Sequence, residues 1–288
     1  MVNSSEFSVP LWENTPPIWG PDVDDNMPQL DLTIKEDARP RPLILLFPSG
    51  GYHHLDIEPL YPIAESILGL DCHVGILHYR TQQALKGENL LDGPLLDSQR
   101  AFRLIRKYSA KWNIIPESLI ALGFGAGAHL AATSAIHADW RSSEFEDSHA
   151  QYPGGPNAMA LGHPIVSNFT GHTHLALGRI LGSFPSEARR SFYQLEHRVT
   201  PVAPRTFLWH TLEDPRNPAH DSFRLARALA EQNVDCELHI FNRGEHAIDW
   251  TEDNTAVSQW KSLFLSWLAR TLPKLSESTS VGLDPKAL

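Results

Sequence analysis

The chain has 288 residues, of which 42% are hydrophobic and 20% are charged, and this length and composition fit one large domain with a full hydrophobic core. The formal net charge is -10 and no basic cluster stands out, so nucleic acid is not an expected partner. No apolar run is long enough to cross a bilayer, and the N-terminus lacks the basic and apolar regions of a signal peptide. We therefore expect a cytoplasmic protein with no membrane partner.

Cys72 and Cys236 fall in apolar segments and are expected to be buried free thiols.

The first half of the chain alternates apolar segments with helical patterns. Residues 1–30 are rich in proline and are expected to form an irregular N-terminal arm, with Trp12 and Trp19 packed on the body of the protein. Residues 30–34 alternate apolar and polar side chains, as an edge strand does, whereas the continuous apolar run at 42–47 predicts a buried central strand. The elements expected next are a helix at 59–68, a strand at 72–79, a helix at 95–108, a strand at 119–122 and a helix ending near residue 137.

The second half of the chain continues the same alternation. Residues 138–200 hold polar loops and a charged helix around 186–193, and are expected to include a cap or insertion over the sheet. The other expected elements are strands at 158–166, 205–210 and 236–241, helices at 222–232 and 257–272, and a flexible tail at 273–288. This alternation predicts a single α/β domain over residues 1–288, with a mostly parallel central sheet covered by helices on both faces.

The candidate site residues lie in loops that follow predicted strands. These loops are residues 48–52, 123–127, 211–218 and 242–246. Because the carboxyl ends of parallel strands share one edge of a sheet, where ligands bind, we expect the loops to meet there. The glycine pair of the first loop has two interpretations: an ordinary tight turn, or a place where backbone N–H groups face a ligand oxygen. The candidate residues are Ser49, Gly50, Gly51, Tyr52, Gly125, Ala126, Asp214 and His246.

The order of these loops is that of the α/β-hydrolases, in which a sharp strand-to-helix turn with the sequence G-x-S-x-G carries the serine nucleophile. The corresponding turn here is Gly123-Phe124-Gly125-Ala126-Gly127. From about residue 9 to residue 268, the chain resembles the acetyl-esterase or xylan-esterase-like branch of this superfamily, also called BD-FAE-like. The other matching motifs are Pro48-Ser49-Gly50-Gly51-Tyr52, Tyr79-Arg80, Asp97-Ser98-Gln99-Arg100-Ala101, Thr211 to Pro218, and Gly244-Glu245-His246-Ala247.

This resemblance implies an α/β-hydrolase fold and a role for each candidate residue. It places Gly125 at the nucleophile position, Asp214 at the acid and His246 at the histidine of the catalytic triad. The oxyanion and substrate-binding residues that it implies are Ser49, Gly50, Gly51, Tyr52 and Ala126. The chain departs from the family pattern at three positions: glycine replaces serine at 125, serine replaces glycine at 49, and alanine replaces glycine at 247.

The missing serine argues against hydrolysis through an acyl-enzyme, because each member of a triad is needed for the full rate. We expect non-hydrolytic, base-assisted chemistry next to a carbonyl: cyclisation, condensation, elimination or isomerisation of a small, natural-product-like substrate. His246 with Asp214 would act as the base beside an oxyanion hole. One alternative is a carboxylic-ester hydrolase, either with Gly125 as an engineered knockout or with a water activated by His246. Another is a non-catalytic pseudoenzyme.

The remaining polar candidates receive weaker roles. Ser49 is a polar turn residue, a hydroxyl donor or a displaced nucleophile. His129, on the helix after the turn, is expected to be structural, while His53 and His54 line the pocket or lie on the surface. No cofactor is expected. A metal site is not expected either, because the two histidines at positions 172 and 174 have no carboxylate or cysteine cluster nearby.

Overall fold

The computed structural model describes residues 3–17, 27–37, 39–85, 90–143, 145–166, 175–246 and 256–277. The strands are β1 (Ser4–Pro10), β2 (Gln29–Lys35), β3 (Arg41–Phe47), β4 (His73–His78), β5 (Ile114–Phe124), β6 (Ala158–Gly162), β7 (Arg205–Thr211) and β8 (Cys236–Phe241). The helices are α1 (Tyr61–Leu68), α2 (Gly93–Lys107), α3 (Ala126–Ile136), α4 (Leu175–Leu181), α5 (Glu187–Phe192), α6 (His220–Glu231) and α7 (Trp260–Glu277).

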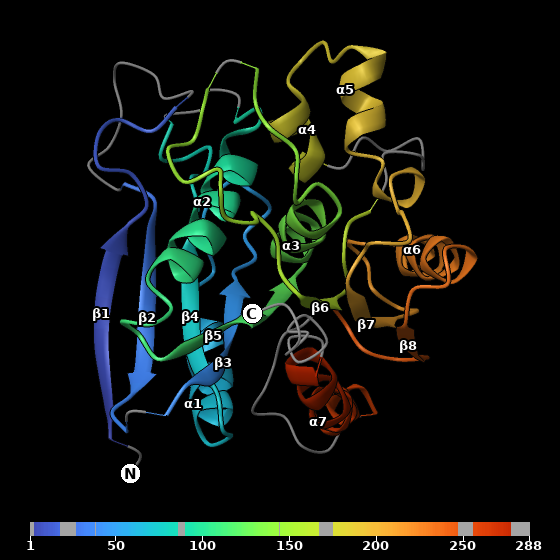
Figure 1. Cartoon of the computed structure of the whole chain (residues 1–288). Helices are drawn as coiled ribbons and strands as arrows, with labels where there is room; N and C mark the ends of the chain where they lie inside the picture. Colours follow the sequence, from blue (N-terminus) through green and yellow to red (C-terminus); the bar gives the residue numbers. More distant parts are fainter. Residues whose placement is uncertain are drawn as a thin grey trace, which may run out of the picture.

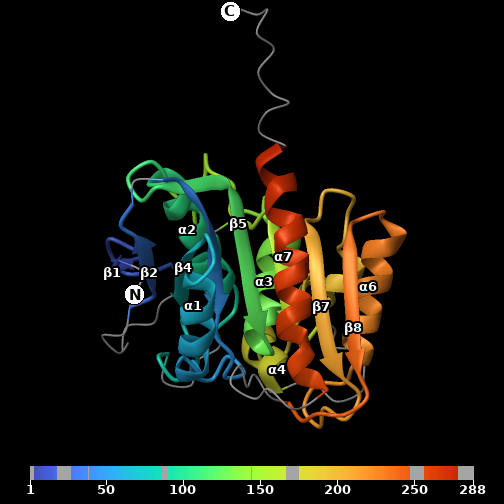
Figure 2. The ribbon, with the colours of Figure 1, turned by 90° about the horizontal axis from the view of Figure 1, so that it is seen from below.

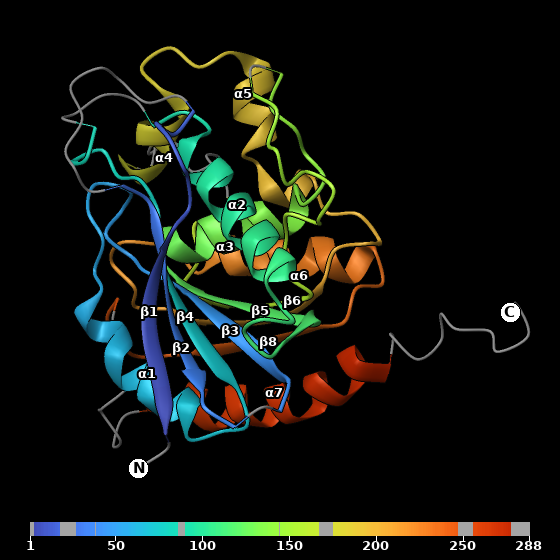
Figure 3. The ribbon, with the colours of Figure 1, turned by 60° about the vertical axis from the view of Figure 1, so that its left-hand side comes forward.

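The strands form one sheet in the order β1-β2-β4-β3-β5-β6-β7-β8 (Figure 1). Strands β1 and β2 run antiparallel to their neighbours, and every pairing from β4 to β8 is parallel. Helices α2, α3 and α6 cover one face of the sheet, and α1 and α7 cover the other (Figures 2 and 3). The predicted α/β fold with a mostly parallel, doubly covered sheet is confirmed.

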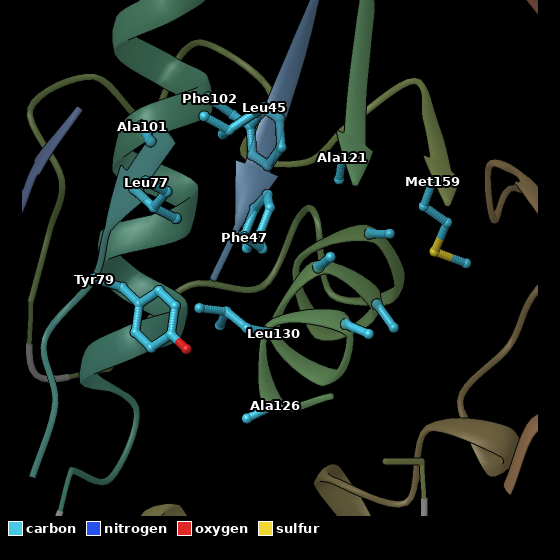
Figure 4. Packing of buried hydrophobic residues seen from close by; sticks show 14 of the residues in the cluster. Leu45, Phe47, Leu77, Tyr79, Ala101, Phe102, Ala121, Ala126, Leu130 and Met159 are labelled. Carbon is cyan, nitrogen blue, oxygen red and sulfur yellow. The ribbon is translucent and has the colours of Figure 1, made fainter. Parts of the chain in front are cut away.

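The alternation of side chains along the central strands explains the two layers. On β3, Leu43, Leu45 and Phe47 belong to the core beneath α2, α3 and α6, whereas Ile44 and Leu46 belong to the core beneath α1 and α7. All of them are fully buried. Figure 4 shows the first core, where Phe47 lies against Phe102 of α2 with ring centroids 6.1 Å apart. Burying both faces of the strand requires a continuous apolar sequence, which is the pattern at residues 42–47.

Two predictions about the N-terminal region are wrong. Residues 4–10 are not irregular but form β1, which pairs along its whole length with β2. The segment at 30–34 is therefore not an edge strand, because β1 covers it. Most β1 side chains are exposed and only a short hydrophobic pattern, Phe7 and Val9, packs against the core, so pairing with β2 is needed to hold the strand. Trp12 is buried on the body of the protein as predicted, and Trp19 lies outside the described residues.

Helix α7 corrects the predicted flexible tail at 273–288. The helix continues to Glu277, past the proline at which the prediction ended. Trp260, Phe264 and Trp267 bury this helix against the sheet, so the loss of one backbone hydrogen bond at a proline does not end it. Residues 278–288 lie outside the described part of the chain.

Residues 138–200 are only partly a cap. They include β6, an interior strand of the sheet, and the short helices α4 and α5 beyond the carboxyl ends of the strands (Figure 1). The charged helix expected around 186–193 is α5, whose N-cap Ser186 accepts a hydrogen bond from the backbone N–H of Arg189. Residues 167–174, including the histidines at 172 and 174, lie outside the described residues.

Helix α3 approaches the end of β3 so closely that Gly127 has no room for a side chain. A Cβ there would overlap the carbonyl oxygen of Phe47 and lie 2.5 Å from that of Pro48. We expect Gly127→Ala to lower the free energy of unfolding by about 1–3 kcal/mol in urea denaturation, because backbone must move to admit the methyl group. The matched control is Gly178→Ala in α4, where nothing lies within 4 Å of an added Cβ. An equal loss in both variants would contradict the steric explanation.

Candidate active site

The four predicted loops meet at the carboxyl edge of the sheet around a pocket of about 1000 Å³. The loop after β3 contributes Ser49 and Gly51, the turn after β5 contributes Gly125, and the loops after β7 and β8 contribute Asp214 and His246. Helix α4, from the predicted insertion, forms another wall of the pocket. Parallel strands explain this convergence, because their carboxyl ends all lie at one edge.

His246 and Asp214 form the polar pair that the sequence predicts. Nδ1 of His246 hydrogen-bonds Oδ2 of Asp214 at 2.7 Å. The other carboxylate oxygen accepts the backbone N–H groups of Arg216 and Asn217 at 2.8 and 2.9 Å, and Nε2 of His210 lies 3.4 Å from Oδ2. The Asp214 side chain is only 1% exposed. Its position and orientation are therefore fixed by four neighbours.

Burial alone would raise the pKa of Asp214. Hydrogen bonds from His210, His246 and the Asn217 N–H outweigh that effect and hold the pKa far below the usual carboxyl value. The carboxylate thus stays negative over the physiological pH range. A permanent negative charge beside His246 orients the imidazole and stabilises its protonated form, as a catalytic acid–histidine pair requires.

Gly125 occupies the apex of the turn between β5 and α3, with a φ of +53°. Its backbone N–H donates to the carbonyl oxygen of Gly162 at 3.0 Å, which fixes the turn against β6. An added Cβ at Gly125 would lie 2.8 Å from Oγ of Ser49, 3.5 Å from Nε2 of His246 and 3.7 Å from Nδ1 of His163. Three polar side chains therefore surround the point where a nucleophile side chain would begin. The structure brings together Gly125, Asp214 and His246 as the sequence predicts.

The loop after β3 also matches its predicted position. Ser49, Gly50, Gly51 and Ala126 all line the pocket. Gly50 has a φ of +109°, and a Cβ there would overlap the carbonyl oxygen of His54, so this position needs glycine. Ala126 is the first residue of α3, where backbone N–H groups have no partner within the helix and can face a ligand oxygen.

Tyr52 does not have the predicted substrate-binding position. Its side chain is 1% exposed, does not line the pocket and lies in the core, hydrogen-bonded through its hydroxyl to Nδ1 of His129 at 2.7 Å. Burial raises the pKa of Tyr52 well above its usual value, so the hydroxyl remains neutral. With a φ of +63°, the residue directs its ring into the core rather than into the pocket. The expected structural role of His129 is confirmed, whereas His53 and His54 line the pocket.

His163 is a site residue to which the sequence analysis gave no role. It follows β6 directly, is 1% exposed, and lies with its ring centroid 4.1 Å from that of His246. Neither ring nitrogen has a hydrogen-bond partner among the described residues. Its one sequence signal is a polar residue placed directly after an apolar strand, at the edge where ligands bind.

His163 also completes a possible metal-binding group. The group consists of three side chains whose ligand atoms, one from each, lie within 4.8 Å of one another: His163, Asp214 and His246. Two imidazoles and a carboxylate suit zinc and similar ions. However, Oδ2 of Asp214 already hydrogen-bonds His246, so a metal held by all three side chains would compete with that pair.

Burial lowers the pKa of His163 well below its usual value, and the neighbouring His246 and His210 lower it further. The unfolded chain therefore binds a proton at this residue below about pH 6.5, while the folded chain does not, so stability falls as the pH falls. We expect His163→Phe to lose less stability than the unmodified protein between pH 7.5 and 5.5, by up to about 1.4 kcal/mol per pH unit. Urea denaturation at several pH values measures the difference. Equal pH slopes for both proteins would contradict a neutral, buried His163.

Comparison with known proteins agrees with this geometry. The prolyl oligopeptidase family model matches residues 172–274. The chain is 29% identical over 232 residues to endo-1,4-beta-xylanase B of Butyrivibrio fibrisolvens and 23% identical over 238 residues to an acetylxylan esterase of Xylanibacter ruminicola. These matches cover 79% and 77% of this chain, but only 35% and 44% of the two relatives, so the chain spans less than half of their length.

A solved structure matches over nearly its whole length. It is the acetyl ester-xyloside bifunctional hydrolase from Caldicellulosiruptor lactoaceticus, which is 31% identical to this chain, with a TM-score of 0.83. The match covers 92% of this chain and 96% of that one. Among the described residues, no helix has the length and apolar character needed to cross a membrane. On these matches and on the arrangement of the site, the chain belongs to the esterase-like branch of the α/β-hydrolase superfamily.

Proposed function

We propose that this protein hydrolyses carboxylic esters of short acyl groups, with acetylated xylose-containing saccharides as the substrate class. The supporting observation is the His246–Asp214 pair, which presents Nε2 of His246 3.5 Å from the point where a side chain of residue 125 would begin. The names of two relatives, an acetylxylan esterase and an acetyl ester-xyloside hydrolase, supply the substrate class. The relatives thus favour ester hydrolysis over the non-hydrolytic chemistry expected from the missing serine.

The pocket supports an ester substrate that carries hydroxyl groups. Ile165, Leu175 and Ala176 give one part of the lining an apolar character. Asp56 and Arg179 are among the polar residues of the lining, and Arg179 donates to the carbonyl oxygen of Gly51 at 2.9 Å. A mainly apolar pocket with a few fixed polar groups is the usual form of a small-molecule site. The apolar part suits an acyl group or the face of a sugar ring, and the polar part suits its hydroxyls.

In the proposed ester hydrolysis, each group has its own step. The ester carbonyl lies over Gly125. The N–H of Ala126 and the backbone N–H groups of the loop after β3, at Gly50 and Gly51, stabilise its developing negative charge. His246 removes the proton from the attacking hydroxyl group and then donates it to the leaving alcohol, while Asp214 stabilises the imidazolium. Because Gly125 has no side chain, the attacking hydroxyl has to come from elsewhere in the pocket.

The second candidate is the non-hydrolytic, base-assisted reaction expected from the sequence. Glycine at position 125 favours it, since no side chain of that residue can form an acyl-enzyme. The same pair, His246 and Asp214, would remove a proton next to a carbonyl, and the same N–H groups would stabilise the resulting enolate.

The test is release of acetate from p-nitrophenyl acetate and from acetylated xylo-oligosaccharides. We expect turnover above the buffer rate, lost when His246 is replaced by alanine. Acetate release at the buffer rate from both substrates would refute ester hydrolysis. Proton exchange next to the carbonyl of a bound ketone, dependent on His246, would then support the second candidate.

A further inference from the structure

We propose that Ser49 is the nucleophile of this protein, presented by the loop after β3 instead of by the turn after β5. This inference rests on the proposed ester hydrolysis and names the group that attacks the substrate. Two of the three departures from the esterase pattern are a serine lost at 125 and a serine gained at 49. In the structure these two positions meet, because Oγ of Ser49 lies 2.8 Å from the place of a Cβ on Gly125.

The position of Ser49 relative to the catalytic base carries the argument. Oγ of Ser49 and Nε2 of His246 both lie within 3.5 Å of the same point above Gly125. Both groups therefore border the space above Gly125 in which the usual serine side chain would lie. Nδ1 of His246 is held by Asp214 at 2.7 Å, so Nε2 is the nitrogen left to accept a proton.

The surroundings of Ser49 fix its backbone and leave its hydroxyl available to a substrate. The residue is 9% exposed and lines the pocket. Its carbonyl oxygen accepts the backbone N–H of Asp56 at 3.2 Å, which pairs the loop with a neighbouring segment. Within the described part of the chain, no side chain or backbone group hydrogen-bonds its Oγ. A hydroxyl that is nearly buried, on a fixed backbone and free to meet a substrate, is suited to nucleophilic attack.

Ser49 also explains why residue 125 is glycine. A side chain at position 125 would begin 2.8 Å from Oγ of Ser49, closer than a Cβ normally approaches another atom. The two side chains therefore compete for one space. Glycine at 125 tolerates the φ of +53° and leaves that space to the Ser49 hydroxyl.

The reaction proceeds in two balanced steps. In the first, Oγ of Ser49 attacks the ester carbonyl carbon while Nε2 of His246 takes the hydroxyl proton, and the tetrahedral oxyanion is held by backbone N–H groups. The bond to the alkoxy oxygen then breaks, and the leaving alcohol takes the proton from His246. In the second step, His246 takes a proton from water, the resulting hydroxide attacks the acyl-Ser49 ester, and Ser49 regains its proton as the acid leaves.

The experiment is covalent labelling of the full chain with a fluorophosphonate, which reacts with activated serines, followed by peptide mapping. We expect one label per chain, on Ser49. Ser49→Ala should prevent labelling and lower kcat for p-nitrophenyl acetate by at least about 10³-fold. Ser262→Ala is the matched control, because this serine lies on α7, away from the pocket. This variant should be labelled on Ser49 and should hydrolyse p-nitrophenyl acetate at the normal rate. Circular dichroism and urea denaturation confirm that the variants fold.

A double variant, Ser49→Gly with Gly125→Ser, tests the shared space. We expect it to recover hydrolysis, with the label moved to position 125. Labelling of the unmodified protein at another residue, or full activity of Ser49→Ala, would overturn the role of Ser49 while leaving ester hydrolysis intact. The role also fails if the double variant is labelled and the unmodified protein is not. A label on Ser49 without turnover of any ester would instead refute the proposed function and retain the nucleophile.

Discussion

Replacing His246 with alanine is expected to lower kcat/KM for ester hydrolysis by about 10⁴–10⁶-fold, the largest effect of any single substitution in this protein. In the proposed hydrolysis this imidazole transfers the proton in every step, whichever hydroxyl attacks the carbonyl. Its Nδ1 lies 2.7 Å from Oδ2 of Asp214. The other histidine beside this carboxylate, His210, is farther away, with its Nε2 3.4 Å from Oδ2. Initial rates with p-nitrophenyl acetate measure the effect.

The control for this substitution is His220→Ala, because His220 is an exposed histidine of α6 outside the pocket. It should leave the rate unchanged. Asp214→Asn should lower the rate by about 10⁴-fold, since an amide no longer stabilises the imidazolium. If His246→Ala kept more than a tenth of the activity, the His246–Asp214 pair would not be the catalytic base of this reaction.

Replacing Arg80 with methionine is expected to lower the free energy of unfolding by about 3–5 kcal/mol, the largest expected effect on stability. Arg80 and Asp97 are fully buried, and their side chains form a two-point ion pair with nitrogen–oxygen distances of 2.6 and 2.8 Å. Asp97 also accepts the indole N–H of Trp12 at 2.8 Å. Removing the arginine leaves a buried carboxylate without its countercharge. Urea denaturation at neutral pH measures the loss.

Two comparisons isolate the buried charge as the cause. The double variant Arg80→Met with Asp97→Leu should be more stable than Arg80→Met alone, because it leaves no unpaired charge. Arg227→Met, which breaks the exposed pair with Glu231 on α6, should show no measurable loss. A double variant no more stable than the single one would show that packing of the arginine side chain, not charge, accounts for the effect.

The sequence by itself determined the main features of the sheet and the order of its site loops. Strand β8 occupies the predicted residues 236–241, and β3 lies at the centre because its continuous apolar run can be buried on both faces. The pairing of His246 with Asp214 was also predictable from the order of the strands. Both residues follow parallel strands, and the carboxyl ends of such strands lie at one edge of the sheet.

Local patterns did not predict features that depend on distant partners. Strand β1 carries a short hydrophobic signal, Phe7 and Val9, and is stabilised along its whole length by pairing with β2. The motifs Tyr79-Arg80 and Asp97 to Ala101 were visible in the sequence, but the buried ion pair that joins them was not. Tyr52 belongs to a pocket loop in sequence and to the core in space, because its backbone conformation turns the ring inward.

Only the tertiary structure showed which side chains lie around the position of the missing serine. The sequence showed a glycine at 125 and a serine at 49, 76 positions earlier, without showing that Oγ of Ser49 lies 2.8 Å from the place of a Cβ on Gly125. It also gave His163 no role, although this residue lies against His246. Such proximity depends on β3, β5 and β6 lying next to one another, which long-range strand pairing sets and no local pattern records.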